Sequence, residues 1–217
     1  MILHKTLFSV IWILVLILTA ASGSPNQLAV ADHHEEDFQE EDSIRICCYW
    51  GDKLADGELT YKIKDSGDSK DQQALRDALE EWDTKITGLR LIEISGDKKE
   101  SDIEIKFRDD GEDIAGQAVN SFDVYGLIDK VMITVSQSAY GNSFDTETIE
   151  HIAKHEMGHA LGLGHANFGG NLMTALVNDG TATISDCEID TVLKANQWKL
   201  IDKETIPHAP SSYEMEC

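Results

Sequence analysis

Residues 151–173 read HIAKHEMGHALGLGHANFGGNLM, and the spacing of the histidines in this stretch predicts its local structure. His155 and His159 stand four residues apart, so on an α-helix their side chains lie one above the other on the same face. Gly162 follows, and because glycine adopts left-handed backbone conformations without a Cβ penalty, it can end this helix and reverse the chain. His165 then approaches the two helical histidines from a separate direction. The stretch therefore predicts three imidazoles that converge on one point.

Three converging imidazoles form a ligand set for Zn²⁺. Neutral imidazole nitrogens bind zinc at about 2.0–2.1 Å, and three protein ligands leave the fourth tetrahedral position open for water, as in catalytic zinc sites. Glu156 stands next to His155, where its carboxylate can take a proton from that water and later pass it to a leaving amine. Met173 is expected to pack under the histidines as an adaptable hydrophobe without binding the metal. The pattern predicts a catalytic zinc site with His155, His159 and His165 as its ligands.

The motif H-E-x-x-H alone is weak evidence for a metal site. It also occurs by chance on amphipathic helices, where a single histidine is usually structural. Here the pattern is longer, because Gly162 and His165 complete H-E-x-x-H-x-x-G-x-x-H and Met173 stands eight residues beyond. Each added position has a mechanical reason for its residue type, so the longer pattern favours the metal site.

The stretch resembles the active-site segment of the metzincin metallopeptidases, and within them that of the matrixins. Further motifs stand in the matrixin order: Trp50, Leu59-Thr60-Tyr61, Ala78-Leu79-Glu80-Glu81-Trp82, Asp102–Phe107 and Leu172-Met173. This resemblance, over residues 44–200, implies an α+β zincin (metzincin) fold with a twisted, mostly parallel five-stranded sheet, two long helices and a C-terminal helix. It also implies a secreted zinc-dependent endopeptidase, a hydrolase that cleaves extended polypeptides with Glu156 as general base and acid.

The same resemblance assigns the substrate-binding residues. Gly116, Gln117, Ala118 and Val119 occupy the place of the matrixin edge strand, whose unpaired backbone groups bind an extended substrate by strand addition. The wall of the pocket is expected over residues 174–180. Matrixins usually have a proline two residues after the turn methionine and serine or threonine after the third histidine, whereas this chain has Ala175 and Ala166. No histidine stands between Phe107 and Glu150, so the second, structural zinc of matrixins is not expected.

Hydrophobic periodicity and turn residues give the expected elements of the chain. Strands are expected over residues 44–50, 59–64, 89–94, 102–107 and 131–135. A helix is expected from a capping box at Ser69 and Gln72 to a stop at Gly88. A second capping box, Ser185 to Glu188, begins a C-terminal helix.

The charge of the chain limits its partners. A net charge of −22, from 40 acidic and 18 basic residues, repels nucleic acid and anionic membranes. Solubility is the commonest cause of such a charge, while salt adaptation and bound Ca²⁺ are alternatives. Four acids surround Gly111 in the loop from Arg108 to Ile114, which suits Ca²⁺ as well as a solvated loop, although the spacing is no EF-hand. We expect a monomer whose partners are polypeptide substrates.

The amino terminus has the layout of an export signal. Lys5, the apolar run Leu7–Leu18 and the small residues Ala20–Gly23 predict a signal peptide over residues 1–23 and a secreted product. The alternative is an uncleaved membrane anchor, although the run is shorter than the roughly 20 residues that span a bilayer. Residues 24–43 are expected to be an acidic leader or short pro-segment, residues 44–203 the peptidase domain, and residues 204–217 an irregular tail.

Export favours disulfides among Cys47, Cys48, Cys187 and Cys217. Four cysteines allow three pairings. Because a bond between neighbouring residues requires a strained ring, we expect the Cys47-Cys48 pair to be bridged to Cys187 and Cys217. A zinc-blocking thiol, as in the matrixin pro-segment, is the weaker alternative because the motif around that thiol is absent.

Two functional hypotheses follow from the sequence. The first is the zinc endopeptidase, and the second is a non-catalytic, zinc-stabilised protein that binds peptides or surfaces on the same scaffold. The presence of Glu156 favours the enzyme, because a retired scaffold is free to lose this carboxylate.

Overall fold

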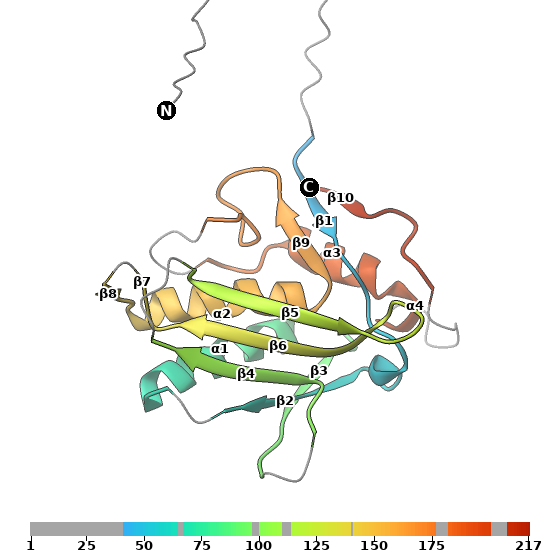
Figure 1. Cartoon of the computed structure of the whole chain (residues 1–217). Helices are drawn as coiled ribbons and strands as arrows, with labels where there is room; N and C mark the ends of the chain where they lie inside the picture. Colours follow the sequence, from blue (N-terminus) through green and yellow to red (C-terminus); the bar gives the residue numbers. More distant parts are fainter. Residues whose placement is uncertain are drawn as a thin grey trace, which may run out of the picture. The chain divides into compact units, whose positions relative to one another are not determined.

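The computed structural model describes residues 41–64, 67–96, 100–109, 114–139, 141–176, 182–200 and 208–217. They belong to one compact unit, Glu40–Cys217, shown in Figure 1. The predicted signal peptide and nearly all of the predicted leader lie outside the described residues. Within the described ranges, no helix has the length and apolar character that a membrane crossing requires.

A five-stranded sheet forms the centre of the unit, in the order β3-β2-β4-β6-β5. Its strands are β2 (Glu58–Ile63), β3 (Arg90–Glu93), β4 (Ile103–Arg108), β5 (Gly116–Phe122) and β6 (Ile128–Ser136). The first four strands of this order are parallel, and β5 pairs with β6 in the antiparallel sense. The predicted, mostly parallel five-stranded sheet is therefore confirmed, with β5 at one edge.

Two long helices, α1 (Ser69–Lys85) and α2 (Thr146–Ala160), pack side by side on the sheet. The fully buried indole of Trp82 joins them, because its Nε1 donates to the carbonyl of Lys154 at 3.0 Å. The predicted capping box at Ser69 is wrong. Asp68 caps α1 instead. Its carboxylate accepts hydrogen bonds from two backbone N–H groups of the first turn, and the helix dipole favours its negative charge at the N-terminus.

Apolar side chains from the sheet and both helices form one core. Branched residues of the central strands alternate inward, as buried strand faces require, and meet the apolar stripes of α1 and α2. The fully buried members of this contact include Leu75, Leu79, Ile103, Ile105, Val131, Ile152 and Met157. Helix α2, which carries His155 and His159, is thus fixed against the sheet and α1.

The C-terminal helix α3 (Asp186–Ala195) begins at Ser185, as predicted. The side chains of Ser185 and Glu188 form the full capping box, and a short helix, α4 (Gln197–Leu200), follows. Short elements complete the described fold: the 3-10 turn η1 (Asp52–Leu54) and the hairpin β7 (Ser138–Ala139) with β8 (Asn142–Ser143).

A second, smaller sheet has the order β10-β1-β9 and consists of β1 (Ser43–Ile46), β9 (Leu163–Ala166) and β10 (Glu214–Glu216). The predicted strand over 44–50 is therefore shorter and lies outside the main sheet. The prediction of an irregular tail is wrong for Glu214–Glu216, because these residues form strand β10 and pair with the edge of β1. Strand β9 pairs with the edge of β1 opposite to β10. Beyond this pairing, Cys47 N donates to Gly162 O at 2.9 Å.

The disulfides differ from the favoured prediction, because the structure pairs Cys47 with Cys48 and Cys187 with Cys217. The second bond follows from β10, which brings Cys217 to the first turn of α3, with a Cα–Cα distance of 5.4 Å to Cys187. Lys194 of the same helix donates to Glu214 O at 2.7 Å and fixes this approach. A strand pairing distant in sequence decides the disulfides, and sequence spacing does not reveal it.

This pairing gives a first testable prediction. Proteolysis under non-reducing conditions should release a fragment that joins Cys187 to Cys217. Replacing both of these residues by serine should lower the free energy of unfolding by about 3–4 kcal/mol in urea, because the bond closes a loop of 30 residues. The matched control, serine at Cys47 and Cys48, should cost less because that bond closes no loop. A fragment joining Cys48 to Cys187 or Cys217 would contradict the structure.

Candidate active site

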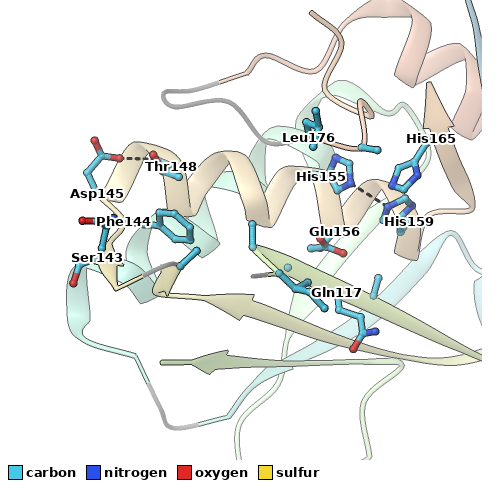
Figure 2. Close-up of a pocket in the computed structure, with 17 residues that line it drawn as sticks. Gln117, Ser143, Phe144, Asp145, Thr148, His155, Glu156, His159, His165 and Leu176 are labelled. Atoms are coloured by element: carbon cyan, nitrogen blue, oxygen red, sulfur yellow. Dashed lines mark hydrogen bonds between the residues drawn. The ribbon is translucent and has the colours of Figure 1, made fainter. Parts of the chain in front are cut away.

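The three histidines of the motif meet at the C-terminal end of α2 (Figure 2). His155 and His159 lie on one face of that helix, with ring centroids 4.7 Å apart. His165 comes from β9, and its ring centroid lies 5.6 Å from that of His155 and 5.0 Å from that of His159. One ligating atom from each residue can be chosen so that all lie within 4.8 Å of one another. The structure therefore brings together the residues that the spacing predicts to converge.

The turn after α2 directs His165 toward the other two histidines. The helix ends at Ala160, and Gly162 has a φ of +103°, a conformation that L side chains rarely adopt. A Cβ at this position would also collide with the carbonyl oxygen of Cys48. The chain reverses here because glycine satisfies both conditions, and β9 begins at the next residue.

Backbone carbonyls fix the orientation of the two helical rings. His155 Nδ1 lies 2.7 Å from Leu172 O, and His159 Nδ1 lies 2.8 Å from Leu163 O. A carbonyl can only accept, so each Nδ1 carries the proton and each Nε2 presents a lone pair. Burial lowers the pKa of His155 to about 4 and also lowers that of His159, which keeps both rings neutral.

The two Nε2 atoms lie only 3.1 Å apart. Two lone pairs facing each other at this distance repel, and neither nitrogen has a proton to share. A cation between them removes the repulsion, and neutral imidazole is a ligand type that Zn²⁺ prefers. The donor set and its orientation therefore fit a zinc ion.

Met173 is fully buried and lies against α2. It packs on Gly158, where an added Cβ would lie 2.5 Å from Met173 Sδ and 3.1 Å from its Cε. The preceding residue, Leu172, supplies the carbonyl that orients His155. Gly158 is not among the site residues expected from the sequence. A glycine inside a helix costs stability relative to alanine, so its presence there is a signal of close packing.

Glu156 directly follows His155 on α2 and is only 4% exposed. Burial raises its pKa to about 8, and a hydrogen bond from the backbone N–H of Ala118 opposes that rise. Its Oε2 atom is buried and has no hydrogen-bond partner among the described residues. A carboxylate in this setting can both accept and return a proton.

A cavity of about 1030 Å³ opens beside the histidines and runs along α2 toward the N-terminus of the helix. Of the predicted substrate-binding residues, Gly116, Gln117, Ala118 and Ala175 line it. Val119 is not among the residues that line it, and its side chain is 44% exposed. Residues 177–180 of the predicted wall lie outside the described residues.

The sequence does not reveal the apolar residues that also line this cavity, which are Ile114, Ala139, Phe144 and Leu176. Phe144 lies at the end near the N-terminus of α2, together with Ser143, Asp145 and Thr148, whereas Leu176 lies near His155 (Figure 2). Phe144 enters from the loop between β8 and α2, and its ring points along the cavity in Figure 2. These residues share no sequence motif, and only the packing of α2 on the sheet collects them.

Residues 110–113 of the predicted calcium loop lie outside the described part of the chain. Of its carboxylates, the described Asp109 accepts a hydrogen bond from Ser138 Oγ at 2.6 Å. This contact gives Asp109 a partner within the fold, and nothing in the described residues supports a calcium site.

Comparison with known families defines the class of this site. A family model described as dual-action HEIGH metallo-peptidase, Peptidase M57, matches residues 59–196. This is more than half of the chain, which therefore belongs to this family of zinc metallopeptidases of the metzincin type. The letters HEIGH correspond to His155–His159, where the chain has Met157 in place of isoleucine. A search of curated proteins found no match.

Zinc should stabilise the folded chain, because the assembled histidines exist only in the folded state. At a free zinc concentration of about 100 times the Kd, the free energy of unfolding should rise by about 2.7 kcal/mol, as measured by thermal unfolding with and without zinc. His155→Ala should abolish this rise. His208→Ala, which removes an exposed histidine outside the cluster, should keep it. An undiminished rise in His155→Ala would contradict the assignment.

Proposed function

We propose that the chain is an exported, matrixin-like zinc endopeptidase that cleaves extended polypeptides. The observation that carries this proposal is the pair of Nε2 lone pairs 3.1 Å apart beside a buried glutamate. The proposed organisation is a signal peptide over residues 1–23, an acidic leader over 24–43, a peptidase domain over 44–203 and a tail over 204–217. The small sheet of β1, β9 and β10 ties this tail to the domain.

The residues of the site divide the chemistry among them. His155, His159 and His165 hold the zinc, which when bound polarises the scissile carbonyl and makes water a better nucleophile. Glu156 accepts a proton as the water attacks and then returns it to the leaving amine, so that each cycle restores the carboxylate. The buried position of Glu156 supports this role, because burial raises the pKa of its carboxyl group to about 8 and so makes the carboxylate a better proton acceptor.

Strand β5 supplies the surface for an extended substrate. Ser136 N donates to Ala115 O, and the register pairs Gly116 with Val135. Because bonding direction alternates along an antiparallel pair, the backbone groups of Gly116, Ala118 and Asn120 face away from β6. The N–H of Ala118 already donates to Glu156. An added peptide strand can pair with the remaining groups, as in other complexes formed by strand addition.

The direction of β5 determines which side of the substrate enters the cavity. Gly116 lies beside Glu156, whereas Asn120 lies near the carbonyl of His159, 3.3 Å from its Nδ2. A substrate antiparallel to β5 therefore places its C-terminal half toward Gly116 and the end of the cavity that Phe144 lines. The side chain that follows the scissile bond enters this end, which favours a large apolar residue.

The proposed role of Glu156 is tested by removing its carboxylate. Glu156→Ala should bind one zinc and lose at least about 100-fold in peptide hydrolysis, because general acid–base catalysis contributes about 10²–10⁴-fold. His159→Ala should lose both zinc and hydrolysis. Glu147→Ala, an exposed carboxylate at the other end of α2, is the matched control and should keep both. Zinc binding without hydrolysis in the unchanged protein would instead favour a non-catalytic binding scaffold.

The proposed pocket is tested by the cleavage-site profile of a denatured protein, read by mass spectrometry. Large apolar residues should be enriched directly after the scissile bond. Phe144→Ala removes one wall of the cavity and should change the profile at this position alone, with zinc content unchanged. A profile that Phe144→Ala leaves unaltered would mean that substrate side chains do not enter this cavity.

A further inference from the structure

The first residue of β5 packs directly against Glu156. A Cβ built on Gly116 would lie 2.7 Å from Glu156 Cγ and 2.7 Å from Ile152 Cγ2, and it would collide with Glu156 Oε1. Gly116 is not among the glycines with a positive φ, so its backbone conformation is open to any residue. The need for glycine at this position therefore comes from the side chains of Glu156 and Ile152, and the shortest contact is to the carboxylate of Glu156.

The same strand also bonds to this carboxylate. The N–H of Ala118, which faces away from β6, donates to Glu156. The edge of β5 thus receives the carboxylate at two points two residues apart: a space without side-chain atoms at Gly116 and a backbone donor at Ala118. The other carboxylate oxygen, Oε2, has no partner among the described residues and remains available.

We propose that Gly116 and Ala118 are positioning residues that fix the proton-accepting carboxylate of Glu156. A general base must lie within about 2.6–3.2 Å of the proton that it takes, and a misplacement of about 1 Å can cost about 10²-fold in rate. This inference rests on the proposed peptidase function. It gives Gly116 a second role. The missing side chain leaves space for the carboxylate of Glu156 as well as for the backbone of the substrate.

Two explanations of Gly116 make opposite kinetic predictions. If the glycine only lets the substrate backbone approach, a methyl group there weakens binding and raises KM. If it makes space for Glu156, the methyl group displaces the carboxylate and lowers kcat, because the lost interaction acts in the transition state. A fall in kcat therefore indicates a positioning role, whereas a rise in KM indicates a binding role.

The first experiment compares Gly116→Ala with Gly169→Ala. Gly169 is an exposed glycine of the loop between His165 and Met173, where an added Cβ meets no atom within 4 Å and φ is not positive. Gly116→Ala should lower kcat about 100-fold, with KM and zinc content near those of the unchanged protein. Gly169→Ala should change none of these quantities. A raised KM with unchanged kcat in Gly116→Ala would overturn the proposal, as would unchanged kinetics in this variant.

A double-mutant cycle tests whether Gly116 acts through Glu156. Glu156→Asp keeps the charge but shortens the side chain by one methylene, so that the carboxylate no longer fills the space over Gly116. Adding Gly116→Ala to Glu156→Asp should then cost less than about 5-fold in kcat, because contacting residues are non-additive. Full additivity of the two losses would overturn the proposal.

Amide hydrogen exchange provides a readout that needs no hydrolysis. In the purified full chain, with and without zinc, the amide of Ala118 should exchange at least about 10-fold faster in Glu156→Ala than in the unchanged protein, since its acceptor is lost. Gly169→Ala should leave this exchange unaltered. Unchanged exchange in Glu156→Ala would overturn the proposal even if Gly116→Ala fails to fold. If exchange is accelerated in Glu156→Ala but the unchanged protein has no peptidase activity, the contact is upheld and the proposed function is refuted.

Discussion

The two hydrogen bonds from histidine Nδ1 atoms to backbone carbonyls are the interactions on which the rest of the site depends. They turn the Nε2 lone pairs of His155 and His159 toward one point, and the carbonyls come from Leu172 and Leu163, which lie in the turn after the motif and in β9. The metal site therefore needs both segments in place. Second-layer hydrogen bonds of this kind fix ring tautomer and orientation in metal sites generally.

The surrounding fold holds these segments and the helix that faces them. Trp50 Nε1 donates to Ala160 O at 2.9 Å, and the buried Asn196 bonds to Trp50 N and to Leu161 O, each at 3.0 Å. On another face of α2, the ammonium of Lys154 is 3% exposed and lies 2.6 Å from carboxylates of Glu81 and Glu150. Breaking such a buried pair leaves an uncompensated charge, which opposes rotation of the helix. The imidazoles and Glu156 are thus presented from a helix fixed at its end and along its side.

Local patterns predicted the parts of this arrangement that short stretches of sequence determine. The helical spacing of His155 and His159, the glycine turn and the alternating strands need only neighbouring residues, and the predicted sheet is confirmed. The parts that were missed depend on contacts between distant segments: the pairing of β1 with β9 and β10, the Cys187–Cys217 bond and the approach of Gly116 to Glu156. The error at Ser69 was smaller, because a neighbouring carboxylate is also a strong helix cap.

The central claim is that three neutral imidazoles from α2 and β9 hold one zinc ion. X-ray absorption at the zinc edge of the purified, zinc-loaded protein tests this most directly, because it reports the type and distance of the atoms bound to the metal. The account predicts imidazole nitrogens at about 2.0–2.1 Å, with outer-sphere scattering from three rings. Sulfur atoms at about 2.3 Å, or zinc bound without imidazole scattering, would contradict it.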